Sequence, residues 1–430
     1  MSSVPPPGDR TDAPAAPLST SAAPVGARPP LRLAVALVIG GILWIGPYIA
    51  SITVLLPARL EIVAPDSKVQ VIATLAIVGS IVALLANIVF GAFSDLTRSR
   101  LGKRTPWMLL GSAITGLSLF ALTRAESVTA IVVVWCVFQF FLNAIVAPLV
   151  AVIPDRVPER MRGTYSAVYG VGFMVGAAAA NIVASRFVAN PTDGFMIMAI
   201  AILFSGPVLA LLAPDKSNAG EPRPAFSRDM LLTNFSFPRR GARDFYLAMF
   251  GKLLFVLAMF AITGYQLYIF TDHLGMDAVG AGAMIATMAT VQLVLSLIFG
   301  AVAGPVSDRV GRRKIFVIGS MLLMAVSLLV PFVWPQPVAM VVFAALGLGV
   351  ASGVFNSVDQ ALNYDVLPNA EAAAKDLGIL NMANTGGQIL GPVVMGVVIS
   401  VTGGYGAGFP IAAGIAVVGA VLISRIRSAR

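Results

Sequence analysis

Two ionisable side chains lie deep inside apolar segments of the 430-residue chain, where they are suited to binding and releasing a proton. Lys252 lies eight residues after Asp244, and Asp359 lies six residues before Asp365. If both segments are helices, these side chains lie about 12 Å and about 9 Å from the same end of the molecule. Because a charge is costly in an apolar medium, such groups indicate a functional site. We expect Asp359 to exchange a proton under the control of Lys252. A permanent ion pair, or a Lys252 that extends toward the surface, is the alternative.

A stripe of polar side chains accompanies Asp359 on one predicted helical face. Asn356, Asp359, Gln360 and Asn363 fall at i, i+3, i+4 and i+7. Amides can bind hydroxyl groups and an aromatic ring can pack on C–H groups, so such residues suit a polyhydroxylated ligand. Packing between helices is the alternative, and it is the use we expect for Asn87. The predicted substrate-binding residues are Trp44, Tyr48, Gln139, Asn143, Gln266, Asn356, Gln360 and Asn363.

The composition identifies the surroundings of the chain. Hydrophobic residues make up 58% of it and charged residues only 11%, whereas a soluble domain has about 25% charged residues. The apolar residues come mostly in runs long enough to cross a hydrocarbon layer about 30 Å thick. Residues 1–30 contain eight prolines and no apolar run, which predicts a disordered tail and not a signal peptide. The sequence therefore predicts an all-α membrane protein.

Twelve apolar segments are predicted to be transmembrane helices. Their ranges are 33–57, 69–94, 107–123, 127–153, 164–187, 194–213, 245–271, 278–303, 315–333, 337–364, 377–402 and 406–424. The longest polar loop, 214–244, separates six segments in 31–213 from six in 245–426. We expect two six-helix bundles joined by a cytoplasmic linker. An even number of helices places both termini on one side.

The distribution of cations predicts which side this is. The two tails and the even-numbered loops hold 24 Lys and Arg residues, whereas the odd-numbered loops hold four. Positive residues collect on the cytoplasmic side of membrane proteins. Both termini are therefore predicted to be cytoplasmic, in a multi-pass protein of the plasma (inner) membrane surrounded by lipid. The net charge of +9 is then a signal of topology, and we expect no nucleic acid as a partner.

One charged motif occurs once in each half. "GAFSDLTRSRLGKRTPW" follows the second segment, and "GPVSDRVGRRK" follows the eighth. A shift of 213 residues places the first copy on the second, since 308 − 95 = 213 for the aspartates, and the same shift places Asn143 on Asn356. The repeat predicts a duplicated six-helix unit with two pseudo-symmetric halves.

With these motifs, twelve segments and a central loop, the chain resembles the major facilitator superfamily of secondary transporters over residues 31–426. The longer first motif, with "PDRVPERMRG" and "LPNAEAAAKDLG", is similar to the glycoside–pentoside–hexuronide:cation and sucrose-type symporters. Where melibiose-type members carry carboxylates in the second helix, this chain has Asn87. The resemblance implies two bundles that rock about a site near the middle of the membrane, lined by helices one, four, seven and ten.

The resemblance also implies a gate at the cytoplasmic face. Asp95 is expected to meet helix eleven, and Asp308 to meet helix five, when this face is closed. A carboxylate there can accept hydrogen bonds from the free N–H groups of a helix start and interact with its dipole. The predicted gate residues are Asp95, Arg98, Arg104, Asp308, Arg309 and Arg312. For Arg104, as for Lys103 and Lys314, topology alone is the preferred interpretation.

We therefore expect a secondary active transporter, acting as a monomer, that moves a small polar, sugar-like solute by proton-coupled symport. Efflux of drugs or secondary metabolites is an alternative, favoured by 17 methionines and 24 phenylalanines. Transport of an organic anion is another, favoured by Lys252. An enzyme is not expected, because one Cys, one His and one buried carboxylate do not form a catalytic constellation. With a single histidine, His273, we expect no metal and no cofactor.

Overall fold

The computed structural model describes residues 31–222, 238, 242–367 and 373–427. Eleven helical segments in these ranges are long and apolar enough to cross a membrane, and the shorter helix α16 (Gly408–Ser424) is the twelfth apolar helix. The described residues form helices, turns and loops and contain no strand. The predicted all-α membrane fold is confirmed. The tail at 1–30 and much of the linker at 214–244 lie outside the described residues.

The two halves have the same order of helices. The N-terminal half contains α1 (Leu31–Ala50), η1 (Ser51–Leu55), α2 (Leu56–Val63), α3 (Lys68–Leu96), α4 (Thr105–Leu122), α5 (Val128–Arg156), α6 (Glu159–Ala184), η2 (Ser185–Phe187) and α7 (Pro191–Leu212). The C-terminal half contains α9 (Arg243–Thr263), α10 (Gln266–Tyr268), η3 (Ile269–His273), α11 (Ala278–Val310), α12 (Arg313–Val333), α13 (Pro337–Phe343), η4 (Ala344–Ala351), α14 (Ser352–Asp365), α15 (Ala373–Thr402) and α16.

Glycines allow very close contacts between helices in each half. A Cβ atom at Gly172 of α6 would clash with the Val38 carbonyl oxygen of α1. A Cβ atom at Gly387 of α15 would lie 2.6 Å from Val256 of α9. Small residues at helix interfaces let backbones approach closely in membrane proteins. The helix pairs α1–α6 and α9–α15 are therefore equivalent, tightly packed units of the two bundles.

The α-helix at the start of each half ends at an equivalent position. The α-helix α1 ends at Ala50, where a π-helical turn follows, and α9 ends at Thr263. The difference, 263 − 50 = 213, equals the offset of the duplicated motif. Within the predicted segment 245–271, the chain turns at Gly264 and Tyr265 before α10 begins. Hydropathy alone does not locate this break, since apolar residues such as Leu267, Ile269 and Phe270 follow it.

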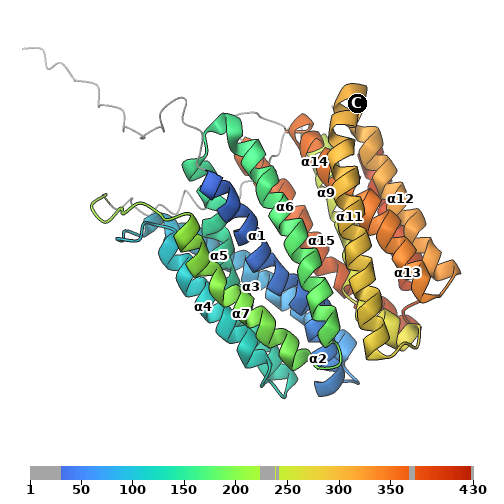
Figure 1. Ribbon diagram of the computed structural model, residues 1–430. Helices are drawn as coiled ribbons and strands as arrows, with labels where there is room; N and C mark the ends of the chain where they lie inside the picture. The colour runs from blue at the N-terminus through green and yellow to red at the C-terminus, as the bar shows by residue number, and fades with distance from the viewer. Residues whose placement is uncertain (1–30, 223–237, 239–241, 368–372, 428–430) are drawn as a thin grey trace, which may run out of the picture.

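The halves contact each other through α3 with α15 and through α6 with α11. Figure 1 shows α6 and α11 close together at the lower end of the molecule and diverging toward the upper end. The upper end is where α1 begins and where the chain ends. We call this end the termini face and the other end the opposite face. The two halves are therefore in contact at the opposite face, and α6 and α11 are farther apart at the termini face.

Candidate functional site

A buried ion pair joins the first and fourth membrane helices of the C-terminal half. Lys252 Nζ of α9 lies 2.7 Å from Asp359 Oδ2 of α14, and the residues are 3% and 4% exposed. Asn363 donates from Nδ2 to the same carboxylate oxygen at 2.9 Å. The Asn363 Oδ1 atom is buried without a hydrogen-bond partner. The structure thus brings together the two residues that the sequence predicts for proton exchange.

A stacked aromatic pair covers this ion pair on the side of the opposite face. The rings of Phe255 and Phe355, from the same two helices, lie 4.0 Å apart with an interplanar angle of 14°. Both side chains are buried. Low polarity around the pair strengthens the attraction between its two opposite charges. It also makes either charge unfavourable without its partner, so the two side chains stay paired and together carry no net charge.

The other two amides of the predicted stripe are exposed. On α14, Gly353 packs against α11, whereas Asp359 faces α9. At about 100° per residue, Asn356 and Gln360 point between these two directions, and both are exposed. The N-terminal half contacts α11, and it also contacts α15, which packs on α9. Since the two amides point between the α11 side and the α9 side of α14, they face the N-terminal half. They are available to a solute that enters between the halves.

Trp44 and Asn143, two predicted residues of the N-terminal half, form hydrogen bonds within that half. Trp44 donates from Nε1 to the Tyr169 hydroxyl at 3.0 Å. Asn143 accepts from Asn87 at 3.1 Å and donates to the Gln139 carbonyl oxygen at 2.9 Å. Trp44, Gln139 and Asn143 are buried. The bonds of Trp44 with Tyr169 and of Asn87 with Asn143 join different helices, which is the use that the sequence favours for Asn87.

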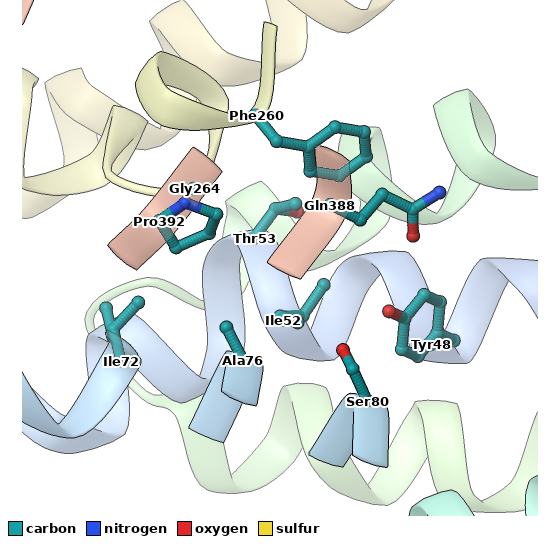
Figure 2. A pocket seen from close by; sticks show the side chains of 10 residues that line it. All are labelled: Tyr48, Ile52, Thr53, Ile72, Ala76, Ser80, Phe260, Gly264, Gln388 and Pro392. Atoms are coloured by element: carbon teal, nitrogen blue, oxygen red, sulfur yellow. The ribbon is translucent and has the colours of Figure 1, made fainter. Parts of the chain in front are cut away.

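A small pocket lies where the two halves meet (Figure 2). The N-terminal half contributes residues from α1, η1 and α3, and the C-terminal half contributes residues from α9, the turn after it and α15. The lining side chains are Tyr48, Ile52, Thr53, Ile72, Ala76, Ser80, Phe260, Gly264, Gln388 and Pro392. The pocket therefore lies beside the π-helical turn η1 and the turn that follows α9. Secondary transporters built from two repeats bind their substrates at the interface between the repeats.

Sequence reasoning found one lining residue of this pocket and missed others. Tyr48 was predicted, and it lines the pocket while stacking on Trp135 at 6.2 Å. Thr53, Ser80 and Gln388 were not assigned to the site. The polar spacing of Ser80 with Asn87, seven residues apart on α3, is the signal that could have found Ser80. The predicted Gln266 is buried in α10, outside the pocket lining.

Polar contacts close the opposite face across the two halves. Lys68 Nζ lies 2.5 Å from Glu61 Oε2 of its own half and 2.8 Å from Asp272 Oδ2 of the other half. The same nitrogen lies 4.6 Å from the centre of the Tyr268 ring. Tyr405 donates to Asp272 Oδ2 at 2.9 Å. Burial, and next the Asp272 charge, raise the pKa of the Tyr405 hydroxyl above its ordinary value, so this group stays protonated as a donor.

Two tyrosines lie between this cluster and the pocket, and they also join the two halves. The Tyr268 hydroxyl donates to the Pro57 carbonyl oxygen at 2.9 Å. The Tyr265 hydroxyl lies 3.0 Å from the carbonyl oxygens of both Val69 and Pro392. Pro392 also lines the pocket. The pocket is therefore separated from the opposite face by buried tyrosines that bind the backbone of the other half.

At the termini face, Arg104 joins two carboxylates of the first motif copy. Its buried guanidinium lies 2.6 Å from Asp95 and 3.0 Å from Asp155 at the end of α5. Arg98 reaches the linker instead and donates to the Pro222 carbonyl oxygen at 3.1 Å. These contacts lie within the N-terminal half and its linker. Arg104 therefore has a structural role that topology alone does not describe.

In the second motif copy, Arg313 takes the equivalent place. Its guanidinium lies 3.0 Å from Asp308 and 3.0 Å from Asp365 at the end of α14. The predicted gate residues Arg309 and Arg312 are exposed. In this conformation the gate aspartates are paired within their own halves, so their predicted contacts to helices five and eleven remain predictions for the closed state.

Asp95→Asn should raise accessibility at the termini face. If Asp95 accepts from the start of helix eleven in the closed state, its loss should shift the population by about two- to fivefold, since such contacts contribute about 0.3–1 kcal/mol. The measurement is thiol labelling of Thr164→Cys, an exposed position at the start of α6, in a Cys136→Ser background. Unchanged labelling with normal transport would show that Asp95 acts on topology only.

Two pseudo-symmetric six-helix bundles, which contact each other at one face beside a pocket between them, are typical of a secondary transporter fold. The Major Facilitator Superfamily profile matches residues 33–301 and 248–430. The chain belongs to this family, and it is a transporter and not an enzyme.

Two crystal structures of this fold are similar to the chain over most of its length. One is a point mutant of the nucleoside transporter NupG, with a TM-score of 0.69, 15% sequence identity, and coverage of 92% of this chain and 99% of that chain. The other is the human organic anion transporter MFSD10 (TETRAN), with a TM-score of 0.66, 16% identity, and coverage of 92% and 100%. A search of curated proteins finds no match to the sequence.

Proposed function

We propose that this protein is a proton-coupled symporter for a small polar organic solute, with Asp359 as the proton site. The observation that carries the proposal is the buried ion pair of Lys252 and Asp359 beside exposed amides. When Lys252 is near, Asp359 stays ionised. When helix motion separates them, Asp359 takes a proton because burial penalises its charged form. Proton binding is then linked to conformation.

The solute site proposed here extends from the pocket toward Asn356 and Gln360. Tyr48 and Phe260 give the pocket aromatic faces, and Ser80 gives it a hydroxyl group. Exposed amides can bind hydroxyl groups of a solute. This combination supports a sugar-like, polyhydroxylated molecule. The similar structures are named for nucleosides and organic anions, which are also small polar organic molecules.

The orientation is proposed from the cations. With 24 Lys and Arg residues in the tails and even-numbered loops, the termini face is cytoplasmic. The structure then represents an inward-facing state in the plasma membrane. Because the pocket is formed between the two halves of one chain, a monomer suffices for transport.

Uptake into proteoliposomes tests the proposal. Labelled polar solutes, starting with glucose and other sugars, should accumulate when the pH outside is lower than inside. Accumulation should disappear when a protonophore removes the gradient. Accumulation that follows a sodium gradient, or binding without flux, would contradict proton-coupled symport.

Efflux of apolar compounds is a second candidate that one observation favours. Ile52, Ile72, Ala76, Phe260 and Pro392 make the pocket lining largely apolar. In an efflux protein, proton entry would expel a lipophilic cation or drug from loaded vesicles. Efflux of such a dye under a pH gradient, without uptake of polar solutes, would establish this candidate.

Gln360→Ala should weaken solute affinity by about 1–3 kcal/mol, because the hydroxyl group that it binds loses its partner on the protein. Isothermal calorimetry on the purified protein measures this. Gln336→Ala, at an exposed loop position, is the matched control and should bind normally. Equal losses of expression and transport would instead assign Gln360 to packing.

A further inference from the structure

The buried ion pair carries an inference about the charge of the solute, which rests on the proposed proton coupling. We infer that the solute is a hydroxylated monocarboxylate, and that its carboxylate binds Lys252 when Asp359 takes up a proton. One anion and one proton then bind together, so the loaded site has the same net charge as the empty site. Transport of the pair moves no net charge.

The argument begins with the charge balance of the described site. Lys252 and Asp359 form a neutral pair whose side chains are almost inaccessible to solvent. A proton on Asp359 alone would leave the Lys252 ammonium buried without a counter-charge, which is strongly unfavourable. An anion on Lys252 alone would place two carboxylates around one ammonium. Simultaneous binding of an anion and a proton avoids both states.

Other charged groups near this helix are engaged elsewhere. On α12, Arg313 pairs with Asp308 of α11 and with Asp365 at the end of α14 itself. Asp376 lies in the first turn of α15, at the helix end of the termini face. Asp359 lies six residues before Asp365, a distance of about 9 Å along the helix. Among the ion pairs of the described residues, Lys252 supplies the cation that contacts Asp359.

The site also contains an acceptor for a protonated Asp359. A neutral carboxyl group carries an O–H donor that requires a partner when it is buried. The Asn363 side chain already contacts Asp359 through Nδ2, and its Oδ1 atom is buried without a partner. Rotation of this amide lets Oδ1 accept from the protonated carboxyl group. The Asn363 Oδ1 atom is thus an acceptor for a protonated Asp359, and it has no partner while Asp359 is ionised.

The neighbouring face defines the rest of the solute. Asn356, about one turn before Asp359, and Gln360, the next residue, are both exposed on the face toward the N-terminal half. A solute carboxylate at Lys252 would place adjacent hydroxyl groups near these amides. The Phe255 and Phe355 stack closes the site on the other side. A small monocarboxylate with several hydroxyl groups therefore fits this combination better than a neutral sugar or a dicarboxylate.

Proton uptake on binding tests the inference directly. Gluconate, lactate and glucose are added to the purified protein in weakly buffered detergent solution with a pH indicator. We expect gluconate to bind with uptake of about one proton per molecule, and lactate to bind more weakly with the same ratio. Glucose should cause no proton uptake. If neither carboxylate binds with proton uptake, the inference is overturned.

Transport in proteoliposomes then separates this inference from the proposed function. Gluconate should accumulate with an inward proton gradient, at a rate that a potassium diffusion potential leaves unchanged. If glucose accumulates with the proton gradient and gluconate does not, proton-coupled symport holds and the inference fails. If the proton gradient drives uptake of none of the three solutes, the inference and the proposed function both fail.

Two variants give opposite signatures that a general loss of folding would not produce. Asp359→Asn leaves Lys252 without its counter-charge, so gluconate should bind at least tenfold more tightly and without proton uptake. Lys252→Gln should weaken gluconate binding at least tenfold. Lys216→Gln, an exposed position in the linker, is the matched control with normal binding. Should Lys252→Gln be poorly folded, the Lys252→Gln/Asp359→Asn pair, which buries no unpaired charge, must still lose gluconate binding. Normal gluconate binding by this pair would overturn the inference.

Discussion

Asp359→Asn should abolish the accumulation of solute driven by a pH gradient while retaining exchange of internal for external solute. Exchange requires no net movement of protons, whereas accumulation requires a group that binds the proton in one conformation and releases it in another. Asp359 is a buried carboxylate whose partner, Lys252, lies on a different helix, so relative motion of α9 and α14 can change its protonation. The measurement compares gradient-driven uptake with counterflow in the same proteoliposomes.

The control for this prediction is a carboxylate outside the pathway. Asp66→Asn removes an exposed charge from the loop between α2 and α3 and should leave both assays unchanged. Loss of accumulation and exchange together in Asp359→Asn would indicate a structural role. Accumulation that persists in this variant would show that another group couples transport to protons.

The helices were predictable because hydropathy and charge act over long stretches. The predicted range 69–94 is close to α3 at Lys68–Leu96, and 278–303 begins where α11 begins, at Ala278. The duplication was predictable because motif residues keep a constant offset. A helix that crosses the lipid needs a continuous run of apolar residues, so the positions of the membrane helices can be predicted from local composition.

The break in the seventh membrane helix was not predictable in the same way. Gly264 lies inside the predicted segment 245–271, and apolar residues such as Leu267, Ile269 and Phe270 continue after it. The break depends on contacts made after folding, such as the Tyr265 hydroxyl with Val69 of the other half. The pocket at this break was missed for the same reason, although Tyr48 on its far side was found.

The gate cations show how local backbone geometry decides between neighbours. Arg309, Arg312 and Arg313 are the same residue type and lie within five positions of one another. Gly311 between them adopts a left-handed conformation with φ of 66° and ends α11. The chain then turns so that Arg313, the first residue of α12, donates back to Asp308 at 3.0 Å. Glycine adopts such positive φ values without strain. Residue spacing alone does not reveal which arginine the turn selects.

Asp272→Asn should open the opposite face. In the described structure Asp272 attracts Lys68 of the other half at 2.8 Å and accepts from Tyr405. Without this charge, Lys68 keeps Glu61, which belongs to its own half, so the variant should fold while losing attraction between the halves. Lys68 is the less exposed partner, so we expect about 1 kcal/mol, near the upper end for such pairs, or about a fivefold shift in population.

The reporter for this shift is Val188→Cys in a Cys136→Ser background. Val188 is buried, and its methyl group faces Gly282 of the other half at the opposite face, so a thiol there reacts only when the halves separate. An impermeant thiol reagent added at this face should label Asp272→Asn about fivefold faster than the parent.

Glu61→Gln is the matched control. It removes a partner of the same lysine but keeps the pair with Asp272, so labelling should not rise. If Glu61→Gln and Asp272→Asn accelerate labelling equally, Lys68 does not hold the halves together through Asp272. Moderate salt should reduce the difference between Asp272→Asn and the parent, because the pair is partly exposed and ions screen such interactions.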